Sequence, residues 1–144
     1  MANMKTMQPV TKIWYDYLRE GKLMGLKCEN CGNMEFPPVP VCNRCGKHHM
    51  EWTPISGKAT LDSYCFAPDG AAPFWKQPVM IGEFTLEEGN HVQTFLLDVG
   101  RAEEPYLYEN CPLECTCEPV KVSEEFDLYY PAFRLNKAPK EEEK

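Results

Sequence analysis

Cys28-Glu29-Asn30-Cys31-Gly32 and Cys42-Asn43-Arg44-Cys45-Gly46 decide the fold of this chain, with ten residues between Cys31 and Cys42. Each Cys-x-x-Cys turn presents two thiols from one tight loop, and the glycine that follows lets the backbone curl back toward the sulfurs. Two such turns predict a tetrahedral shell of four sulfur ligands. Because a closed shell has no open coordination position, the metal would stabilise the fold and would not hydrolyse a substrate.

The type of ligand limits which metal ions can bind. Four sulfurs favour zinc, with iron as the competitor, because magnesium and calcium prefer oxygen ligands. Two small-loop disulfides or a redox-active dithiol are the alternatives that the same spacing allows. We expect one structural zinc ion per chain, bound by Cys28, Cys31, Cys42 and Cys45.

The length and composition of the chain limit its possible architectures and indicate its cellular compartment. With 144 residues, the chain can form one compact domain or a small module beside a medium one. It has no run of eighteen apolar residues, and residues 1–5 lack the apolar stretch of a signal peptide. We therefore expect a cytoplasmic protein whose eight cysteines are thiols and metal ligands rather than disulfides.

The charge is distributed unevenly along the chain. The net charge is −7, but residues 1–58 have a balance of +3 and residues 59–136 a balance of −10. Four thiolates around a zinc ion add about −2 to the more basic half. This pattern disfavours binding to nucleic acid, and the lack of a long apolar run gives no reason to expect a membrane.

Residues 1–21 are expected to contain one short amphipathic helix. Its apolar residues recur three and four positions apart, and they are Val10, Ile13, Trp14, Tyr17 and Leu18. Gly21 lies where a helix needs a left-handed cap. We interpret the two aromatic residues of this stripe as core residues, although such a stripe could also contact a partner.

Residues 22–56 are predicted to form an irregular zinc ribbon. The connection between the knuckles is too rich in proline for a helix, and Phe36-Pro37-Pro38 would form a stiff, extended apolar ridge. Such a ridge loses little conformational entropy when a partner binds it. Packing of the ridge against its own ribbon is the equally weighted alternative.

Residues 57–136 change to β-branched and aromatic segments interrupted by turns. Five strands are expected, at residues 58–66, 79–86, 92–98, 115–122 and 127–130, with a hairpin turn at residues 87–90. Five short strands suit an OB-like barrel, although a sandwich has a similar pattern. The fold class is therefore mainly β, and residues 137–144 are expected to be a disordered tail.

Two long loops accompany the predicted barrel. Residues 67–78 place Phe74 and Trp75 beside Lys76, and large aromatic residues on a loop must be buried somewhere. We favour contact with a ligand or a partner over folding back onto the barrel. The second loop, residues 99–112, is acidic and contains Tyr106 and Tyr108.

The remaining reactive side chains are interpreted as structural. A second metal site is possible in principle, but buried small hydrophobic residues are the better explanation for Cys65, Cys111, Cys115 and Cys117. A surface or core-edge position is expected for His48, His49 and His91. The sequence has no catalytic-triad, phosphate-loop or zinc-protease motif, so we do not expect independent catalysis. A lone cysteine that meets a distant histidine in the fold is the remaining enzymatic alternative.

These features together resemble a known family, domain of unknown function 35, over about residues 14–136. The specific part of the resemblance is the first knuckle, then Phe36-Pro37-Pro38, the second knuckle and Gly57 at the start of the first barrel strand. Weaker matches are Pro78, Glu88-Gly89, Pro112 and Pro131-x-Phe133. The chain departs from the family pattern at Asn43, where proline is usual, at Ala59, and at Asn110-Cys111.

The resemblance implies an N-terminal helix, a rubredoxin-like zinc ribbon and an OB fold. It also implies a noncatalytic accessory subunit that binds CoA or an acyl-CoA and assembles with a thiolase-like catalytic subunit, or that bridges a thiolase and a hydroxymethylglutaryl-CoA synthase. In that role the aromatic loop could hold the pantetheine arm. The candidate phosphate-binding residues are Lys22, Lys27, Arg44, Lys47 and Lys58.

Two other functions use the same features. An OB module could bind single-stranded nucleic acid through a basic groove and stacking aromatic residues, which the charge disfavours. A rubredoxin-like iron site could carry electrons, and its colour would separate it from zinc.

Overall fold

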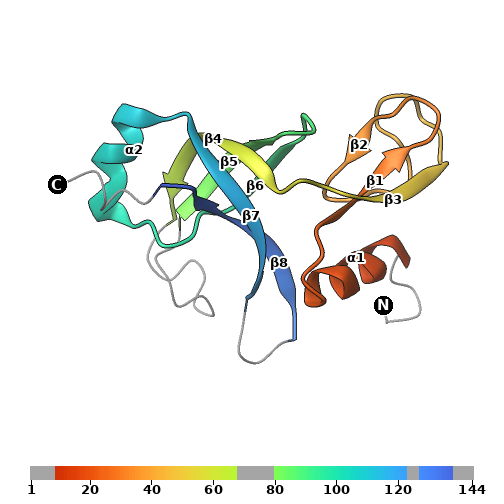
Figure 1. Cartoon of the computed structure of the whole chain (residues 1–144), viewed down its shortest axis with the longest axis horizontal. Helices are drawn as coiled ribbons and strands as arrows, with labels where there is room; N and C mark the ends of the chain where they lie inside the picture. The colour runs from red at the N-terminus through yellow and green to blue at the C-terminus, as the bar shows by residue number, and fades with distance from the viewer. Residues whose placement is uncertain (1–8, 68–79, 123–126, 138–144) are drawn as a thin grey trace.

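The computed structural model describes residues 9–67, 80–122 and 127–137. Figure 1 shows a small ribbon beside an N-terminal helix, joined to a larger curled sheet with a second helix at its far end. The loop residues Phe74, Trp75 and Lys76 and the tail residues 138–144 lie outside the described residues. Within that part of the chain, no helix is long and apolar enough to span a membrane.

Helix α1 (Pro9–Arg19) forms where the apolar periodicity predicted it. Trp14 and Leu18 face inward and are 3% and 0% exposed. The indole ring of Trp14 lies 5.6 Å from the rings of both Phe36 and Tyr130, measured between ring centroids. The chain then reverses at Gly21, whose φ of +83° is the left-handed conformation that a helix cap requires. Helix α1 therefore packs on both the ribbon and the barrel.

The ribbon is a regular three-stranded antiparallel sheet, where the sequence predicted an irregular segment. Its strands are β1 (Met24–Cys28), β2 (Met34–Glu35) and β3 (Met50–Pro54), in the order β2-β1-β3. The knuckles align the strands, because the Cys28 N–H donates to the Asn33 carbonyl at 2.8 Å and the Glu29 N–H donates to the His49 carbonyl at 2.9 Å. The pairing comes from these turns and not from an alternating sequence pattern.

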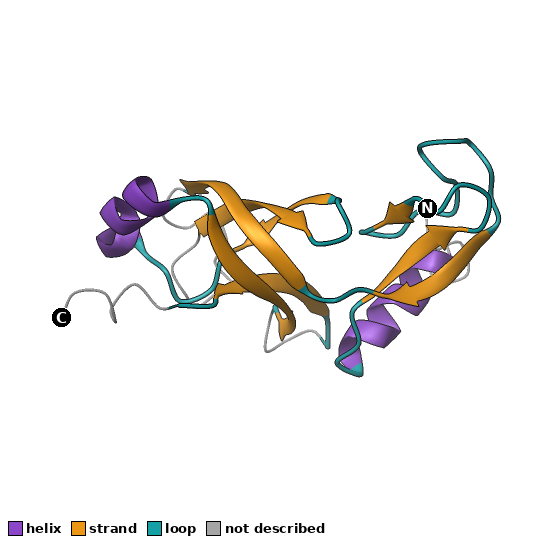
Figure 2. Ribbon diagram, turned by 45° about the horizontal axis from the view of Figure 1, so that its top comes forward, coloured by secondary structure: helices purple, strands orange, loops and turns teal. Residues whose placement is uncertain are grey.

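The larger sheet has the five strands that were predicted, and its curvature confirms the OB-like fold class (Figure 2). The strand order is β6-β5-β4-β7-β8. The strands are β4 (Lys58–Phe66), β5 (Met80–Leu86), β6 (His91–Phe95), β7 (Leu113–Lys121) and β8 (Tyr129–Leu135). The two edges approach each other beyond β6, where the Leu97 N–H donates to the Phe133 carbonyl at 2.8 Å.

The barrel interior is filled by large apolar side chains. Phe84 and Phe133 are fully buried, and their rings stack with centroids 4.0 Å apart. Gly82 also faces inward, and a Cβ atom there would lie 2.6 Å from the Phe84 ring and 2.7 Å from Leu61. A residue with no side chain is therefore needed at this position for the two phenylalanine rings to stack.

Strand β8 is longer than predicted. The sequence prediction ended near Tyr130, yet the strand continues through Pro131 to Leu135, although proline cannot donate to a ladder. Pro131 is paired with Pro119 on β7. Both residues lack an N–H group, and they face each other at one position of the ladder. The Pro131 carbonyl is still used, because it accepts a hydrogen bond from the Thr94 hydroxyl at 2.8 Å.

The predicted second loop is largely helical, which corrects the sequence interpretation. A 3-10 turn η1 (Arg101–Glu103) leads directly into α2 (Glu104–Asn110), whose first turn contains the acidic Glu104 followed by a proline. Leu107 is fully buried and anchors the helix, whereas Tyr108 is 80% exposed. Helix α2 caps the end of the barrel that is remote from the ribbon (Figure 1).

Candidate metal centre and its surroundings

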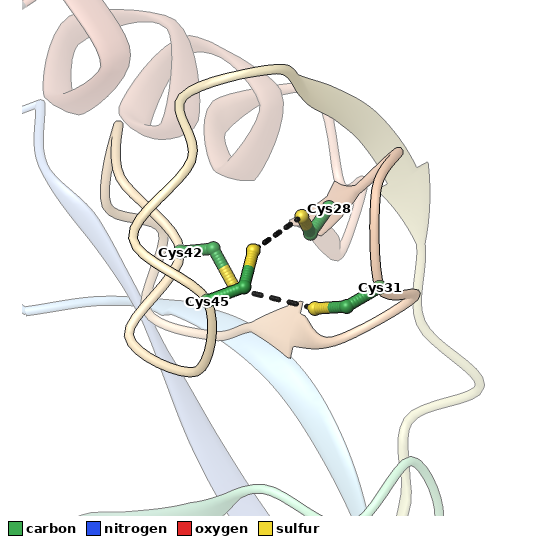
Figure 3. A group of neighbouring side chains, drawn as sticks. All are labelled: Cys28, Cys31, Cys42 and Cys45. Atoms are coloured by element: carbon green, nitrogen blue, oxygen red, sulfur yellow. Dashed lines mark hydrogen bonds between the residues drawn. The ribbon is translucent and has the colours of Figure 1, made fainter.

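The structure brings the four knuckle cysteines together at the tip of the ribbon (Figure 3). All four sulfur atoms lie within 4.8 Å of one another, and the Cys28–Cys45 and Cys31–Cys42 sulfur pairs are each 3.6 Å apart. Cys28 and Cys42 are buried, while Cys31 and Cys45 lie at the surface. Each knuckle therefore contributes one inner and one outer sulfur.

The spacing of these sulfurs fits a tetrahedral metal ion. A zinc–sulfur bond of about 2.3 Å in tetrahedral geometry separates the sulfurs by about 3.8 Å. The 3.6 Å separations lie close to that value and well beyond a covalent S–S bond of about 2.05 Å. The alternative of two disulfides is therefore disfavoured. A bound ion would supply a charge that holds the two knuckles together.

Glycine closes each knuckle in the left-handed conformation that the sequence indicated. Gly32 and Gly46 have φ values of +79° and +78°. Their N–H groups donate to the carbonyls of Cys28 and Cys42, respectively, at 2.9 Å. The two knuckles are therefore built alike, and each turns its backbone around its own pair of sulfurs.

Local hydrogen bonds lower the pKa of one of the four cysteines. Burial alone would raise the pKa of Cys42, but the backbone N–H groups of Cys45 and Arg44 lower it to about 6. The side-chain amide of Asn33, 3.5 Å from the Cys42 sulfur, adds to this effect. At Cys31 a hydrogen bond from the Asn33 backbone opposes burial and the neighbouring sulfurs, which together raise the pKa to about 11. Metal binding therefore requires at least one thiol to release its proton.

A buried carboxylate lies beside the second knuckle, and the sequence interpretation missed it. Glu35, at the end of β2, is 8% exposed and accepts hydrogen bonds from Asn33 and Asn43. Asn33 also contacts the Cys42 sulfur. The sequence feature that could have indicated this buried carboxylate is the presence of two asparagines and a glutamate within and beside the knuckles.

The proposed apolar ridge is only partly accessible. Phe36 is 3% exposed and packs edge-on against Trp14, so its side chain is not available to a partner. This corrects the expectation of a docking role for Phe36 and supports the alternative that the segment packs on its own chain. Pro37 is exposed and Pro38 is half-buried. The segment also ends in an exposed large hydrophobic residue, Val41, which is 46% exposed.

The five candidate phosphate-binding residues are spread over several elements. Lys22, just after α1, forms an ion pair with Glu20 at 3.3 Å. Lys27 lies on β1, and Arg44 and Lys47 lie in or beside the second knuckle. Lys58 begins β4 and lines a separate groove of about 510 Å³. Arg44 and Lys47 are thus the two that lie in one segment around the second knuckle, and Lys27 directly precedes the ligand Cys28.

The other four cysteines do not join a metal site within the described part of the chain. Cys115 and Cys117 are buried in the barrel, as predicted, and burial raises the pKa of each thiol to about 12. Cys111 is half-buried. Cys65 is exposed on β4, which corrects the expectation that all four would be buried.

One polar cluster on the outer sheet surface has the residue types of a catalytic set. The Thr85 hydroxyl contacts the Asp62 carboxylate and lies 3.1 Å from Nδ1 of His91. A carboxylate only accepts hydrogen bonds, so the hydroxyl must donate to Asp62, and Nδ1 of His91 must then carry a hydrogen. An imidazole nitrogen that already carries its hydrogen cannot take the Thr85 proton. The cluster is therefore not arranged to activate a nucleophile.

His48 and His49 lie at the surface beyond the second knuckle, as expected. Their rings stack on each other with centroids 4.7 Å apart, and neither belongs to the sulfur cluster. Among the described residues, the metal centre is therefore formed by cysteine alone.

These observations define a class: a protein with a four-cysteine zinc ribbon and an OB-like barrel. Residues 16–51 match a family model described as the ChsH2 rubredoxin-like zinc ribbon domain. A DUF35 domain-containing scaffold protein of Pyrococcus furiosus is 31% identical over 124 residues, which cover 85% of each chain. The chain belongs to this DUF35 family, which confirms the resemblance found in the sequence. Family and geometry together support zinc binding at the four cysteines.

Two further similarities extend this result. The chain is similar to the Ltp2-ChsH2(DUF35) aldolase structure, with a TM-score of 0.73 and 19% identity, over 91% of this chain and 98% of that one. This similarity supports the fold. A probable enoyl-CoA hydratase alpha subunit of Thermomonospora curvata is 24% identical over 86 residues, which are 60% of this chain and 27% of that protein.

Proposed function

We propose that the chain is a noncatalytic, zinc-containing accessory subunit of an acyl-CoA thiolase complex. It would scaffold the catalytic subunit and help to bind the CoA ester. The observation that carries the proposal is the closed sulfur shell, because four cysteine ligands leave no position for a substrate or a water nucleophile. A metal bound in this way stabilises a surface and leaves bond cleavage to another polypeptide.

The relatives support this type of role. The Pyrococcus furiosus relative is named a scaffold protein, and the Thermomonospora curvata relative is named an enoyl-CoA hydratase subunit. The ChsH2 relative of known structure is recorded together with Ltp2 as an aldolase. These names support a subunit that works beside a catalytic chain in acyl-CoA metabolism.

The exposed surface of the ribbon suits contact with a CoA ester or a partner. Arg44 and Lys47 project beside the metal centre, and Val41 adds an exposed apolar side chain. Basic groups can bind the CoA phosphates, and the stapled knuckle holds them with little loss of conformational entropy. The loop residues Phe74, Trp75 and Lys76 remain candidates for the pantetheine arm.

The narrowest form of the proposal is the small zinc subunit of benzoylsuccinyl-CoA thiolase, the enzyme that ends anaerobic toluene degradation. That thiolase uses CoA to cleave benzoylsuccinyl-CoA into benzoyl-CoA and succinyl-CoA. A subunit that bridges a thiolase and a hydroxymethylglutaryl-CoA synthase is the alternative within the same class. The identity of the partner chain separates the two.

Nucleic-acid binding is less well supported by the barrel. OB folds bind single strands on the outer face of their second and third strands, with basic and aromatic side chains. On β5 and β6 that face has no lysine or arginine, and its one phenylalanine is partly buried; its residues are Ile81, Glu83, Thr85, His91, Gln93 and Phe95. We therefore expect no retention on single-stranded DNA at physiological salt, and salt-sensitive retention would contradict this view.

Purification from the native cell under mild conditions tests the proposal. A tagged chain should elute with a thiolase-like protein, and CoA-ester cleavage should require both chains. Mass spectrometry of the partner and the pattern of CoA esters that are cleaved would identify the acyl group. A chain that elutes alone and shows no affinity for CoA esters would overturn the proposal.

A further inference from the structure

The carboxylate of Glu35 is buried at the base of the second knuckle. Its residue is 8% exposed, whereas Glu29 and Glu51 of the same ribbon are exposed. Removing a carboxylate from water costs several kcal/mol unless its oxygens accept hydrogen bonds from well-placed donors. A carboxylate in this position therefore needs hydrogen-bond donors that offset the free-energy cost of removing it from water.

Three donors surround the Glu35 carboxylate. The side-chain amide of Asn33 donates to Oε2 at 2.7 Å, and the backbone N–H of Asn43 donates to the same oxygen at 3.0 Å. The side-chain amide of Asn43 donates to Oε1 at 3.0 Å. Asn43 lies inside the second Cys-x-x-Cys turn. The carboxylate therefore ties that turn to strand β2 of the ribbon sheet.

The same network reaches a metal-binding sulfur. Nδ2 of Asn33 lies 2.7 Å from the Glu35 carboxylate and 3.5 Å from the sulfur of Cys42. An amide nitrogen carries two hydrogens, so it can donate to both acceptors at once. The carboxylate thus orients the amide, and the amide in turn points a hydrogen at the Cys42 sulfur.

We propose that Glu35 is a positioning residue for the metal centre: it holds the second knuckle against β2 and fixes the Cys42 sulfur for the ion. Groups that orient metal ligands in this way commonly change metal affinity by about 10- to 100-fold when they are replaced. This role goes beyond the proposed function and does not depend on a partner or on CoA.

Zinc release from the intact chain tests this role. Glu35→Gln keeps the size of the side chain, but it removes the charge and turns an N–H donor toward a cluster of donors. Release of zinc to an excess of a chromogenic chelator should become about 10- to 100-fold faster than in the wild type. Glu51→Gln, at an exposed site on β3, is the matched control and should release zinc at the wild-type rate.

A second variant separates positioning from a general loss of folding. Asn43→Ala removes one side-chain donor and keeps the backbone N–H, so it should speed release less than Glu35→Gln does. The double variant should be no faster than Glu35→Gln alone, because both changes remove the same contact.

Wild-type release from a folded Glu35→Gln chain would overturn the role of Glu35, as would additive effects in the double variant. If Glu35→Gln fails to fold, Asn43→Ala alone decides. Faster release from Asn43→Ala would support the proposal, and release at the wild-type rate would overturn it.

Discussion

The ribbon and the barrel are both built from short antiparallel strands, but different forces hold them together. The ribbon has strands of two to five residues, and its tip is organised by four sulfurs and the carboxylate of Glu35. The barrel has strands of five to nine residues around a core in which Phe84 and Phe133 are fully buried. A small unit with little apolar core commonly needs a metal, whereas the barrel can rely on burial.

This difference separates two kinds of surface. The ribbon presents basic and apolar side chains on a support that we expect to depend on its metal, and the barrel presents an acidic surface on a support that we expect to fold without it. The carbonyl of Met34, next to Glu35, accepts a hydrogen bond from the side chain of Asn90 in the β5–β6 hairpin. The two regions therefore touch close to the metal centre, and the experiments below test how far each can be perturbed separately.

Metal removal should have the largest effect. Binding of a structural zinc ion supplies about 10–16 kcal/mol of folding free energy in small zinc modules. A chelator under reducing conditions should therefore unfold the ribbon and leave the barrel folded. In hydrogen exchange, the amides of β1 and β3 should lose protection while those of β4 and β5 keep it. Simultaneous loss of protection in all four strands would show that the barrel also depends on the metal.

The stability of the two regions should depend on pH over different ranges. The pKa of Cys42 is lowered from 9.0 to about 6, so the stability it contributes to the metal-free ribbon is present above pH 9 and is lost as the pH falls toward 6. The pKa of Cys31 is raised to about 11, so its contribution to the ribbon is present below pH 9 and is lost as the pH rises toward 11. The pH dependence that distinguishes the ribbon therefore lies between pH 6 and pH 9. Burial raises the pKa of Cys115 and Cys117 from 9.0 to about 12, so the barrel should lose stability as the pH rises above 9.

Denaturant melts of the zinc-free protein between pH 6 and pH 11, followed separately for each region by hydrogen exchange, measure this difference. In the zinc-bound protein, release to a chelator should also become faster from pH 9 to pH 6, because protons compete with the ion for the thiolates. Parallel pH profiles for the two regions would contradict the assignment.

Truncation of the barrel core should destabilise the barrel alone. Phe84→Ala removes one of two stacked, fully buried rings and should lower the free energy of unfolding by about 3–5 kcal/mol. Urea denaturation followed by circular dichroism measures the change. Tyr108→Ala, at an 80% exposed site, is the control and should change stability by less than about 0.5 kcal/mol. Faster zinc release from folded Phe84→Ala would show that the regions are coupled.

A pair of glycine substitutions gives the smallest predicted effects and compares the two regions directly. Gly82→Ala would place a Cβ atom 2.6 Å from the Phe84 ring, and Gly25→Ala would place one 2.9 Å from the Glu35 carbonyl oxygen. Overpacking of this kind costs about 1–3 kcal/mol. Gly82→Ala should lower the urea midpoint of the barrel without affecting zinc release. Gly25→Ala should speed zinc release, and the reverse pattern would contradict the separation.

The parts of the fold that local sequence determines were predictable. The periodicity of the apolar residues predicted α1 and the five barrel strands, because in each of these elements one face packs on the core and the opposite face is exposed to solvent. The spacing of Cys28, Cys31, Cys42 and Cys45 indicated a metal centre because ligand geometry is local to each turn. Both signals are contained in windows of a few residues.

The features that were missed depend on contacts between distant segments. The pairing of β1 with β3 joins Leu26 to Trp52 and is imposed by the closed knuckles, so neither strand has a clear alternation of its own. Helix α2 was interpreted as a loop because it is only seven residues long, although its proline and acidic first turn were available signals. Glu35 resembled a surface residue, since its burial becomes visible only when Asn33 and Asn43 converge on it.

A metal ion enclosed by four cysteines should stabilise the fold and take no part in binding the substrate. X-ray absorption at the zinc edge of the purified protein, before and after addition of CoA and its esters, tests this claim most directly. We expect one zinc per chain with four sulfur neighbours at about 2.3 Å and no change when the esters are added. A nitrogen or oxygen ligand, or a new ligand that appears with the ester, would contradict it.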